Sequence, residues 1–145
     1  MSFIIDFKEI PPGNIGGSGQ DEFELFSRDF LEALGFKIIY PPNRGPDNGK
    51  DMIVSGKWNG SQTILWLVSC KHNAHSKTSH AVNCKDEINI IERLTVNKCK
   101  GFIGIYSTIA ATTLSTMLYG LKDKIQSEIF DHRLIEKLIL EKIFI

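Results

Sequence analysis

The sequence predicts an α/β sandwich in which a mixed β-sheet is flanked by helices. Three observations support this: an amphipathic segment at 21–36, two β-prone segments at 51–55 and 63–71 joined through a hairpin signal, and an apolar segment at 101–107 followed by leucines at helical spacing. Mixed runs of strands and helices of this kind place helices against a sheet. We expect residues 1–145 to form a single domain, because the chain is too short for two ordinary ones.

The composition limits the classes of partner. The chain has 17 Lys and Arg against 17 Asp and Glu, so its formal net charge is zero, and 42% of its residues are hydrophobic. No global basic field is available to attract nucleic acid. Any binding of DNA or RNA must therefore depend on a local basic patch.

The cysteines and the N-terminal segment predict a cytoplasmic protein. Cys70, Cys84 and Cys99 are odd in number and lack paired metal-ligand spacing, which is typical of free, packed thiols in a reducing compartment. The opening "MSFIIDFKEI" contains acidic residues and no long apolar run, which predicts neither a signal peptide nor a membrane span.

Residues 1–19 predict an N-terminal extension and a glycine-rich connector. "FIIDF" at 3–7 could form a short strand, and "PPGNIGGSGQ" at 11–20 lacks both the dinucleotide fingerprint and the P-loop lysine. The helix at 21–36 follows, with an apolar stripe and Gly35 at its C-terminal end. The stripe consists of Phe23, Phe26, Phe30, Leu31 and Leu34. Glu24 lies at its rim, where a solvated side chain is the ordinary interpretation.

The loop of the predicted hairpin decides which polar side chains share a face. A short strand, "KIIYPP" at 37–42, precedes the hairpin. A two-residue Asn-Gly turn would pair Asp51 with Val68 and leave Ser69 and Lys71 on the opposite face. A three-residue loop would pair Asp51 with Leu67 and put all three on one side. Lys71 falls where the second strand leaves the core, a place where lysines are also common as solvating residues.

Glu87 is an acid in an apolar setting. The segment at 83–97 has Cys84, Ile88, Ile91 and Leu94 at helical spacing, and Glu87 falls in the middle of this stripe. An ionised carboxylate in the core costs several kcal/mol unless something compensates its charge. The sequence therefore leaves three possibilities, namely a metal ion, a basic partner or a misjudged helix phase.

The rest of the chain completes the sandwich. The strand at 101–107 precedes a helix marked by Leu114, Met117, Leu118 and Leu121, and "SEIFD" at 127–131 predicts a further strand. The last helix, at 132–145, is apolar nearly all round. It is either deeply packed or continues into a partner or a further domain.

Acidic groups and one lysine converge in this arrangement. The hairpin brings Asp51, Ser69 and Lys71 to one end, and Glu24 and Glu87 could reach that end from the two neighbouring helices. Magnesium prefers carboxylate oxygens, and a nearby lysine adds positive charge toward a phosphate or a nascent hydroxide.

The blocks "DEFELFSRDFLEALGF", "GPDNGKDMIV" and "LWLVSCKH" resemble the opening blocks of Mrr-like restriction endonucleases, in the PD-(D/E)XK nuclease superfamily. In that family a Phe-Glu pair opens the first helix, a Gly-rich loop precedes a metal-binding Asp, and a strand ends in Cys-Lys. Glu24, Asp51 and Lys71 occupy the matching positions, and the likeness extends over roughly residues 20 to 140. The resemblance implies a restriction-endonuclease-like sandwich with an αβββαβ core.

Ser69 departs from the family pattern, which has Glu, Asp or Gln two residues before the lysine. Either the site is inactive, or Glu87 supplies the missing carboxylate, as in similar enzymes with a Ser-x-Lys strand. The resemblance then implies that Asp51 and Glu87 bind Mg²⁺, with Mn²⁺ able to substitute and Glu24 as an additional ligand. Lys71 would orient the attacking water.

The loop after the lysine carries basic and histidine side chains that we expect to contact DNA phosphates; they are His72, His75, Lys77, His80 and Lys85. A solvated polar loop is the alternative, whereas a zinc site would lack ligands.

The resemblance therefore implies a metal-dependent DNA endonuclease of restriction or anti-phage defence type. The alternatives are an inactive nuclease-fold module that binds or assembles, and a structure-selective nuclease such as a resolvase or an RNase. One site cuts one strand, so we expect a homodimer, a higher oligomer or a fused sensor domain.

Overall fold

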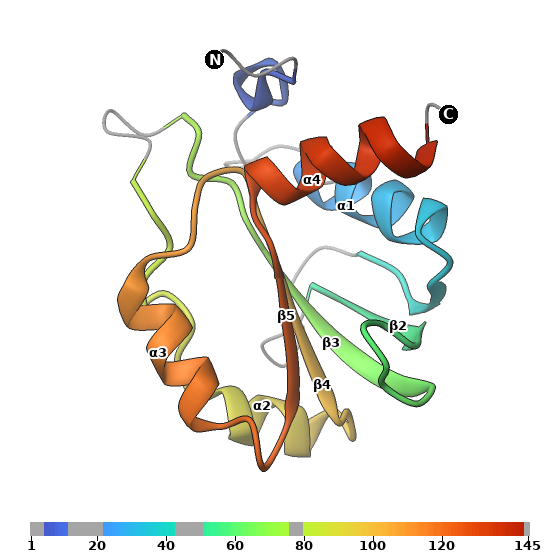
Figure 1. Ribbon diagram of the computed structural model, residues 1–145, viewed down its shortest axis with the longest axis vertical. Helices are drawn as coiled ribbons and strands as arrows, with labels where there is room; N and C mark the ends of the chain where they lie inside the picture. Colours follow the sequence, from blue (N-terminus) through green and yellow to red (C-terminus); the bar gives the residue numbers. More distant parts are fainter. Residues whose placement is uncertain (1–4, 12–21, 43–50, 76–79, 144–145) are drawn as a thin grey trace.

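A computed structural model of the chain describes residues 5–11, 22–42, 51–75 and 80–143. Within these ranges the chain forms one five-stranded sheet in the order β1-β2-β3-β4-β5 (Figure 1). The first three strands pair antiparallel and the last three parallel. The strands are β1 (Lys37–Tyr40), β2 (Met52–Gly56), β3 (Ile64–Lys71), β4 (Gly101–Tyr106) and β5 (Gln126–Phe130). The predicted mixed sheet is confirmed.

Helices cover both faces of this sheet. Figure 1 shows α1 and α4 together on one side, and α2 and α3 on the other. The helices are α1 (Glu22–Ala33), α2 (Ile90–Val96), α3 (Thr112–Gly120) and α4 (His132–Leu138), with a 3₁₀ turn η1 (Phe7–Glu9) and a π-helical end η2 (Ile139–Ile143). Successive side chains of β3 point to opposite faces of the sheet. Trp66 and Val68 therefore pack in the apolar layer under α1 and α4, and Leu67 packs in the layer under α2 and α3. The predicted sandwich is therefore confirmed.

The first helix forms as its apolar spacing predicts. Phe23, Phe30 and Leu31 are buried in the α1/α4 layer. Gly35 has a φ of 103°, a left-handed value that glycine adopts without strain, and it ends the helix where predicted. The predicted strand at 3–7 is not found in its described part, because the Asp6 carboxylate caps η1 by accepting the Lys8 N–H at 2.9 Å.

The register of the hairpin differs from both predicted alternatives. Met52 lies opposite Val68, which puts Asp51 beside Ser69 instead of opposite Leu67. The connection runs from residue 57 to 63, with Asn59 and Gly60 both in the left-handed region. The longer loop thus shifts the pairing by one residue from the two-residue-turn alternative and by two residues from the three-residue-loop alternative. The parity is that of the three-residue loop, so Asp51 shares a side of the hairpin with Ser69.

The second helix begins later in the structure than the predicted segment at 83–97 does. Residues 84–87 form turns, Asn89 is left-handed with a φ of 55°, and α2 starts only at Ile90. An Asn-Asp turn replaces the first helical turn, since the Asn83 N–H donates to the Asp86 carboxylate at 3.0 Å. The predicted stripe is accordingly wrong at Ile88, whose side chain is 59% exposed.

The later elements agree with their predicted ranges. β4, α3 and β5 form as expected, and α4 is deeply packed, with Ile135 and Leu138 buried in the α1/α4 layer. An isolated parallel bridge joins Val82 to Ala110 and ties the segment before Glu87 to the start of α3. Among the described residues, no helix combines the length and the apolar character needed to span a bilayer.

Candidate active site at the ends of β2 and β3

The end of β3 carries the polar residues that the sequence singled out. Ser69 and Lys71 are two residues apart and so project from the same face of the strand, whereas Cys70 joins the α1/α4 layer. The parallel neighbour β4 places Gly104 beside Ser69 and Tyr106 beside Lys71. Lys71 is half-buried at the point where β3 leaves the sheet, as predicted.

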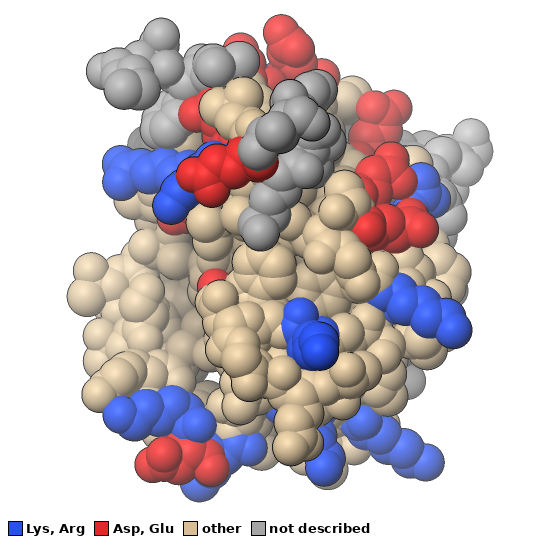
Figure 2. All heavy atoms as spheres, turned by 45° about the vertical axis from the view of Figure 1, so that its right-hand side comes forward, with Lys and Arg blue, Asp and Glu red and all other residues tan. Residues whose placement is uncertain are grey.

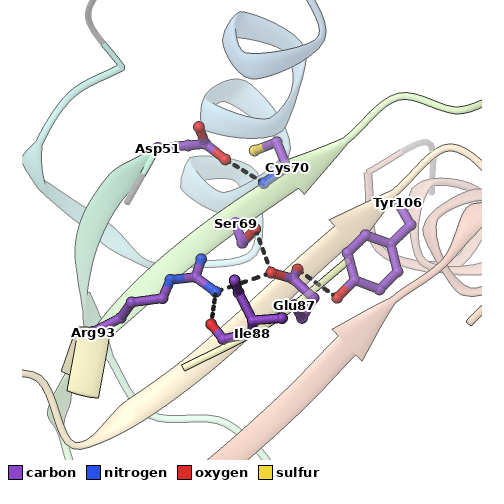
Figure 3. A network of polar contacts seen from close by, with 7 residues as sticks. All are labelled: Asp51, Ser69, Cys70, Glu87, Ile88, Arg93 and Tyr106. Atoms are coloured by element: carbon purple, nitrogen blue, oxygen red, sulfur yellow. Dashed lines mark hydrogen bonds and ion pairs between the residues drawn. The ribbon is translucent and has the colours of Figure 1, made fainter. Parts of the chain in front are cut away.

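Asp51 contacts the backbone on both sides of Ser69. Its N–H donates to the Val68 carbonyl at 2.9 Å, and its carboxylate accepts the Cys70 N–H at 2.5 Å (Figure 3). The carboxylate is thus held at the end of the sheet, one residue from Ser69 and one from Lys71. The predicted grouping of Asp51, Ser69 and Lys71 at one end of the hairpin agrees with this placement.

Glu87 is fully buried, and its carboxylate is surrounded by donors. Oε1 accepts from the Ser69 hydroxyl at 3.0 Å and from Nη1 of Arg93 at 3.1 Å, while Oε2 accepts from the Tyr106 hydroxyl at 2.8 Å (Figure 3). Arg93, on α2, also donates to the Ile88 carbonyl at 3.2 Å. A basic partner and a helix that begins later than predicted together explain how the interior accepts this acid.

Tyr106 reaches Glu87 because β4 has a glycine two residues earlier. A Cβ at Gly104 would collide with the Tyr106 hydroxyl and with Ile129, so the tyrosine side chain occupies the space above the glycine backbone. Burial raises the pKa of Tyr106 far above its ordinary value, and the nearby Glu87 charge raises it further. The phenol therefore stays protonated as a hydrogen-bond donor.

The three predicted acidic ligands are not gathered into one cage. Glu24 lies in the first turn of α1, in the layer on the opposite face of the sheet from Glu87. Among the described residues, no group of three or more His, Cys, Asp or Glu side chains could hold a metal ion. The closest grouping that the hydrogen bonds describe is Glu87 at Ser69 and Asp51 at Cys70. The ligand assignment stays a prediction.

The histidines behind Lys71 are partly structural. The His72 ring lies in hydrogen-bonding distance of the Ser107 hydroxyl and the Ile10 carbonyl, both at 2.8 Å, and stacks on Phe23 with 4.7 Å between ring centres. His75 reaches the same Ile10 carbonyl at 2.5 Å. These contacts connect the segment after η1 to the end of β3, and the role of His72 and His75 in DNA binding stays a prediction.

Two other predicted DNA contacts, His80 and Lys85, are exposed, and Lys77 lies outside the described residues. Sequence reasoning missed Arg93 and Tyr106. The need of a buried Glu87 for a basic partner was the available signal, and Arg93 is the one arginine in the segment at 83–97.

Comparisons with known proteins agree with this geometry. A family model described as restriction endonuclease, for the Mrr-type catalytic domain, matches residues 18–103. The structure is similar to the DNA modification-dependent restriction endonuclease AspBHI, with a TM-score of 0.58 and 14% identity over 81% of this chain and 30% of that one. It is also similar to the MspJI restriction endonuclease in complex with a 27-mer oligonucleotide, with a TM-score of 0.51 and 15% identity over 81% of this chain and 27% of that one.

A search of curated proteins gave no match. The two structural relatives are below 25% identity and establish the fold alone, and the chain spans less than a third of either. The family model covers more than half of the chain, including Glu24, Asp51, Lys71 and Glu87. The chain belongs to the restriction endonuclease family, with the Mrr-type catalytic domain.

Proposed function

We propose that the chain hydrolyses DNA phosphodiester bonds as an endonuclease domain of restriction or anti-phage defence type. The observation that carries the proposal is the Glu87 carboxylate 3.0 Å from the Ser69 hydroxyl, two residues before Lys71. An acid from outside β3 thus stands where the family pattern has one on the strand. DNA as the substrate is supported by family membership and by the oligonucleotide bound to MspJI.

Restriction endonucleases generally use divalent metal ions, and the carboxylates of Asp51 and Glu87 are the type of ligand that such an ion prefers. Mg²⁺ is commonly held by one or two carboxylates together with substrate phosphate and water. Asp51 and Glu87, which approach neighbouring positions of β3, would hold it. The predicted additional ligand Glu24 would have to approach the ion from α1, which packs on the other face of the sheet from Glu87. When bound, Mg²⁺ or Mn²⁺ would polarise the phosphodiester and acidify a water molecule.

Lys71 and Arg93 take different parts in the proposed reaction. Lys71 orients the attacking water and stabilises negative charge on the phosphorane, because its ammonium projects from the same strand face as Ser69. Arg93 neutralises Glu87 in the arrangement described above and must withdraw before that carboxylate can bind a cation. Ser69 keeps Glu87 on the β3 side of the network through its hydroxyl.

The test uses supercoiled plasmid, single-stranded DNA and RNA, each incubated with Mg²⁺, Mn²⁺ or a chelator. We expect metal-dependent loss of supercoiled plasmid, and a rate lower by at least about 100-fold in Lys71→Ala, the scale of a lost charge-stabilising group. Lys137→Ala, at an exposed lysine on α4 outside the predicted DNA contacts, is the comparison for a simple loss of charge. Full activity of folded Lys71→Ala would remove the lysine from the mechanism.

The Glu87–Arg93 ion pair favours a second candidate, a nuclease fold that binds without cutting. A carboxylate with three donors and no exposure serves as a structural anion as well as it serves as a latent ligand. No cleavage of any substrate at high protein concentration in Mn²⁺ would favour this candidate. Cleavage of RNA or of branched DNA in place of plasmid would instead favour an RNase or a resolvase.

The proposal extends to assembly, because the chain matches less than a third of each structural relative. We expect it to act as the effector part of a larger protein in the cytoplasm, or as a homodimer or higher oligomer. Cleavage whose rate rises with the square of protein concentration would support dimerisation.

A further inference from the structure

Lysines gather at the end of the sheet opposite the candidate active site. β1 and β3–β5 all begin at this end and β2 finishes there, whereas Asp51 and Lys71 lie at the other end. We call this surface the lysine end; its members, all exposed, are Lys37, Lys57, Lys98, Lys100, Lys122 and Lys124. They come from four places in the chain, namely the start of β1 and the β2–β3, α2–β4 and α3–β5 connections, so the fold brings them together.

Three of these lysines line one cleft. The cleft has a volume of about 630 Å³, and Lys100, Lys122 and Lys124 face the loop at 60–62 across it, with Asp123 as the acid among its lining residues. Its backbone is held by the sheet, since the Lys100 N–H donates to the Leu65 carbonyl at 3.1 Å. The cleft is therefore a formed feature of the domain.

One lysine of the cleft is also held in place. The Lys122 ammonium donates to the Tyr119 hydroxyl at 2.8 Å and lies 3.9 Å from the centre of the tyrosine ring. Tyr119 itself is 68% exposed. Less side-chain entropy is lost when an anion binds a lysine that is already oriented.

Charge is separated along the molecule, although the whole chain is neutral. Figure 2 shows most of the Asp and Glu side chains in the upper half of that face and most of the Lys and Arg side chains in the lower half. A zero net charge therefore hides a local basic surface of the kind that binds polyanions. The sequence analysis requires a local basic patch for any binding of nucleic acid, and the lysine end is such a patch, separate from the loop between His72 and Lys85.

We propose that the lysine end binds the phosphate backbone of duplex DNA, as a second DNA contact separate from the catalytic end. Lysine is a point-charge ligand for phosphates, and contacts to the backbone position DNA without reading its sequence. β3 has eight residues and so separates the two ends by about 25 Å. This distance corresponds to about seven base pairs of duplex, so one duplex lying along the molecule, or a second segment of DNA, can contact the lysine end while DNA is held at Lys71.

This inference deepens the proposed function, but its test does not require cleavage. Fluorescence anisotropy with a labelled 20-base-pair duplex is measured in chelator over a series of KCl concentrations. The test variant is Lys100→Glu/Lys122→Glu/Lys124→Glu. The control of equal charge change is Lys8→Glu/Arg133→Glu/Lys137→Glu, whose three side chains are exposed and outside the lysine end. Thermal melts verify that both variants are folded.

We expect the test variant to bind the duplex at least about tenfold more weakly, and its log K against log[salt] slope to be smaller by about 2 to 3, as for three lost phosphate contacts. The control should lose no more than about threefold. Equal losses in both variants, or unchanged binding in the test variant, overturn the inference, and unchanged binding points to an acidic protein partner for this surface. Wild-type chain that binds through the lysine end without cutting contradicts only the proposed function.

Discussion

Arg93 and Glu87 form an ion pair across the boundary between surface and interior. Nη1 of the arginine lies 3.1 Å from Oε1 of the glutamate, and the two side chains are 17% and 0% exposed. The arginine keeps some hydration, while the glutamate depends entirely on its protein partners. The stability of this region therefore depends on which member of the pair is removed.

Arg93→Met should destabilise the fold by about 3 kcal/mol, because it leaves a buried carboxylate without its cation. Glu87→Gln/Arg93→Met should recover part of this loss, since the remaining amide can still bond to Ser69 and Tyr106. Urea unfolding of the single and double variants gives the coupling free energy. Additive effects of the two changes would mean that the pair contributes nothing beyond its individual members.

Tyr106→Phe should cost about 1.5 to 3 kcal/mol, the range for a buried hydrogen bond to a charged acceptor. The change removes the donor to Oε2 of Glu87 and leaves the ring in place. Tyr119→Phe removes the hydroxyl from an exposed ring and is the matched control, with an expected cost below about 0.5 kcal/mol. Equal unfolding free energies for the two variants would contradict a structural role of the Tyr106 bond.

The buried phenol predicts a dependence of stability on alkaline pH. Burial raises the pKa of Tyr106 in the folded state, so the native protein keeps a proton that the unfolded chain releases above the ordinary tyrosine pKa of about 10. Stability from this group is fully present below that pH and is lost progressively above it. Thermal melts between pH 8 and 11 should therefore fall more steeply in the wild type than in Tyr106→Phe.

Gly104→Ala should destabilise the protein by about 1 to 3 kcal/mol, as an overpacked core position does. The new methyl group would collide with the Tyr106 hydroxyl and displace it from Glu87. Gly120→Ala, at a position with open space around its Cα, is the control and should change stability little. A melting temperature of Gly104→Ala equal to that of the wild type would contradict this prediction, because the Tyr106 side chain would then have another position of low energy.

Moving the carboxylate from position 87 to position 69 tests whether the site needs an acid that comes from the turn or only an acid at this point in space. Ser69→Glu alone should destabilise the chain strongly, because it puts a second acid beside the buried Glu87. Ser69→Glu/Glu87→Gln restores a single carboxylate at this point and should recover most of the stability. If the proposed function holds, the double variant also cleaves plasmid faster than Glu87→Gln; a double variant as inactive as Glu87→Gln would show that the acid must come from the turn.

Local patterns in the sequence predict much of this fold and only part of its site. The stripe of α1 and the apolar strands depend on nearest-neighbour spacing, so Phe23, Phe30 and Trp66 are buried as expected. The hairpin register depends on the conformation of the seven loop residues at 57–63. The Asn-Gly pair in this loop does not determine how long the loop is, although both of its residues are left-handed. Parity nevertheless kept Asp51 beside Ser69.

Glu87 is buried as the sequence predicts, but it lies in a turn and not in the predicted helix. Its burial was predicted from a helix that does not exist there, because the turn at Asn83 and Asp86 outcompetes helical propensity. Arg93 and Tyr106 reach it from α2 and from β4, and such contacts between distant elements leave no periodic trace in the sequence. His72, which stays a predicted DNA contact, is hydrogen-bonded to Ile10 and Ser107, and no local pattern reveals these two partners.

The parallel bridge between Val82 and Ala110 connects the turn that carries Glu87 to the start of α3. The Val82 N–H donates to the Ile109 carbonyl at 2.9 Å, and the Ala111 N–H donates back to the Val82 carbonyl at 2.7 Å. Val82 lies five positions before Glu87, so a displacement at the start of α3 would pull on the turn that holds the Glu87 carboxylate.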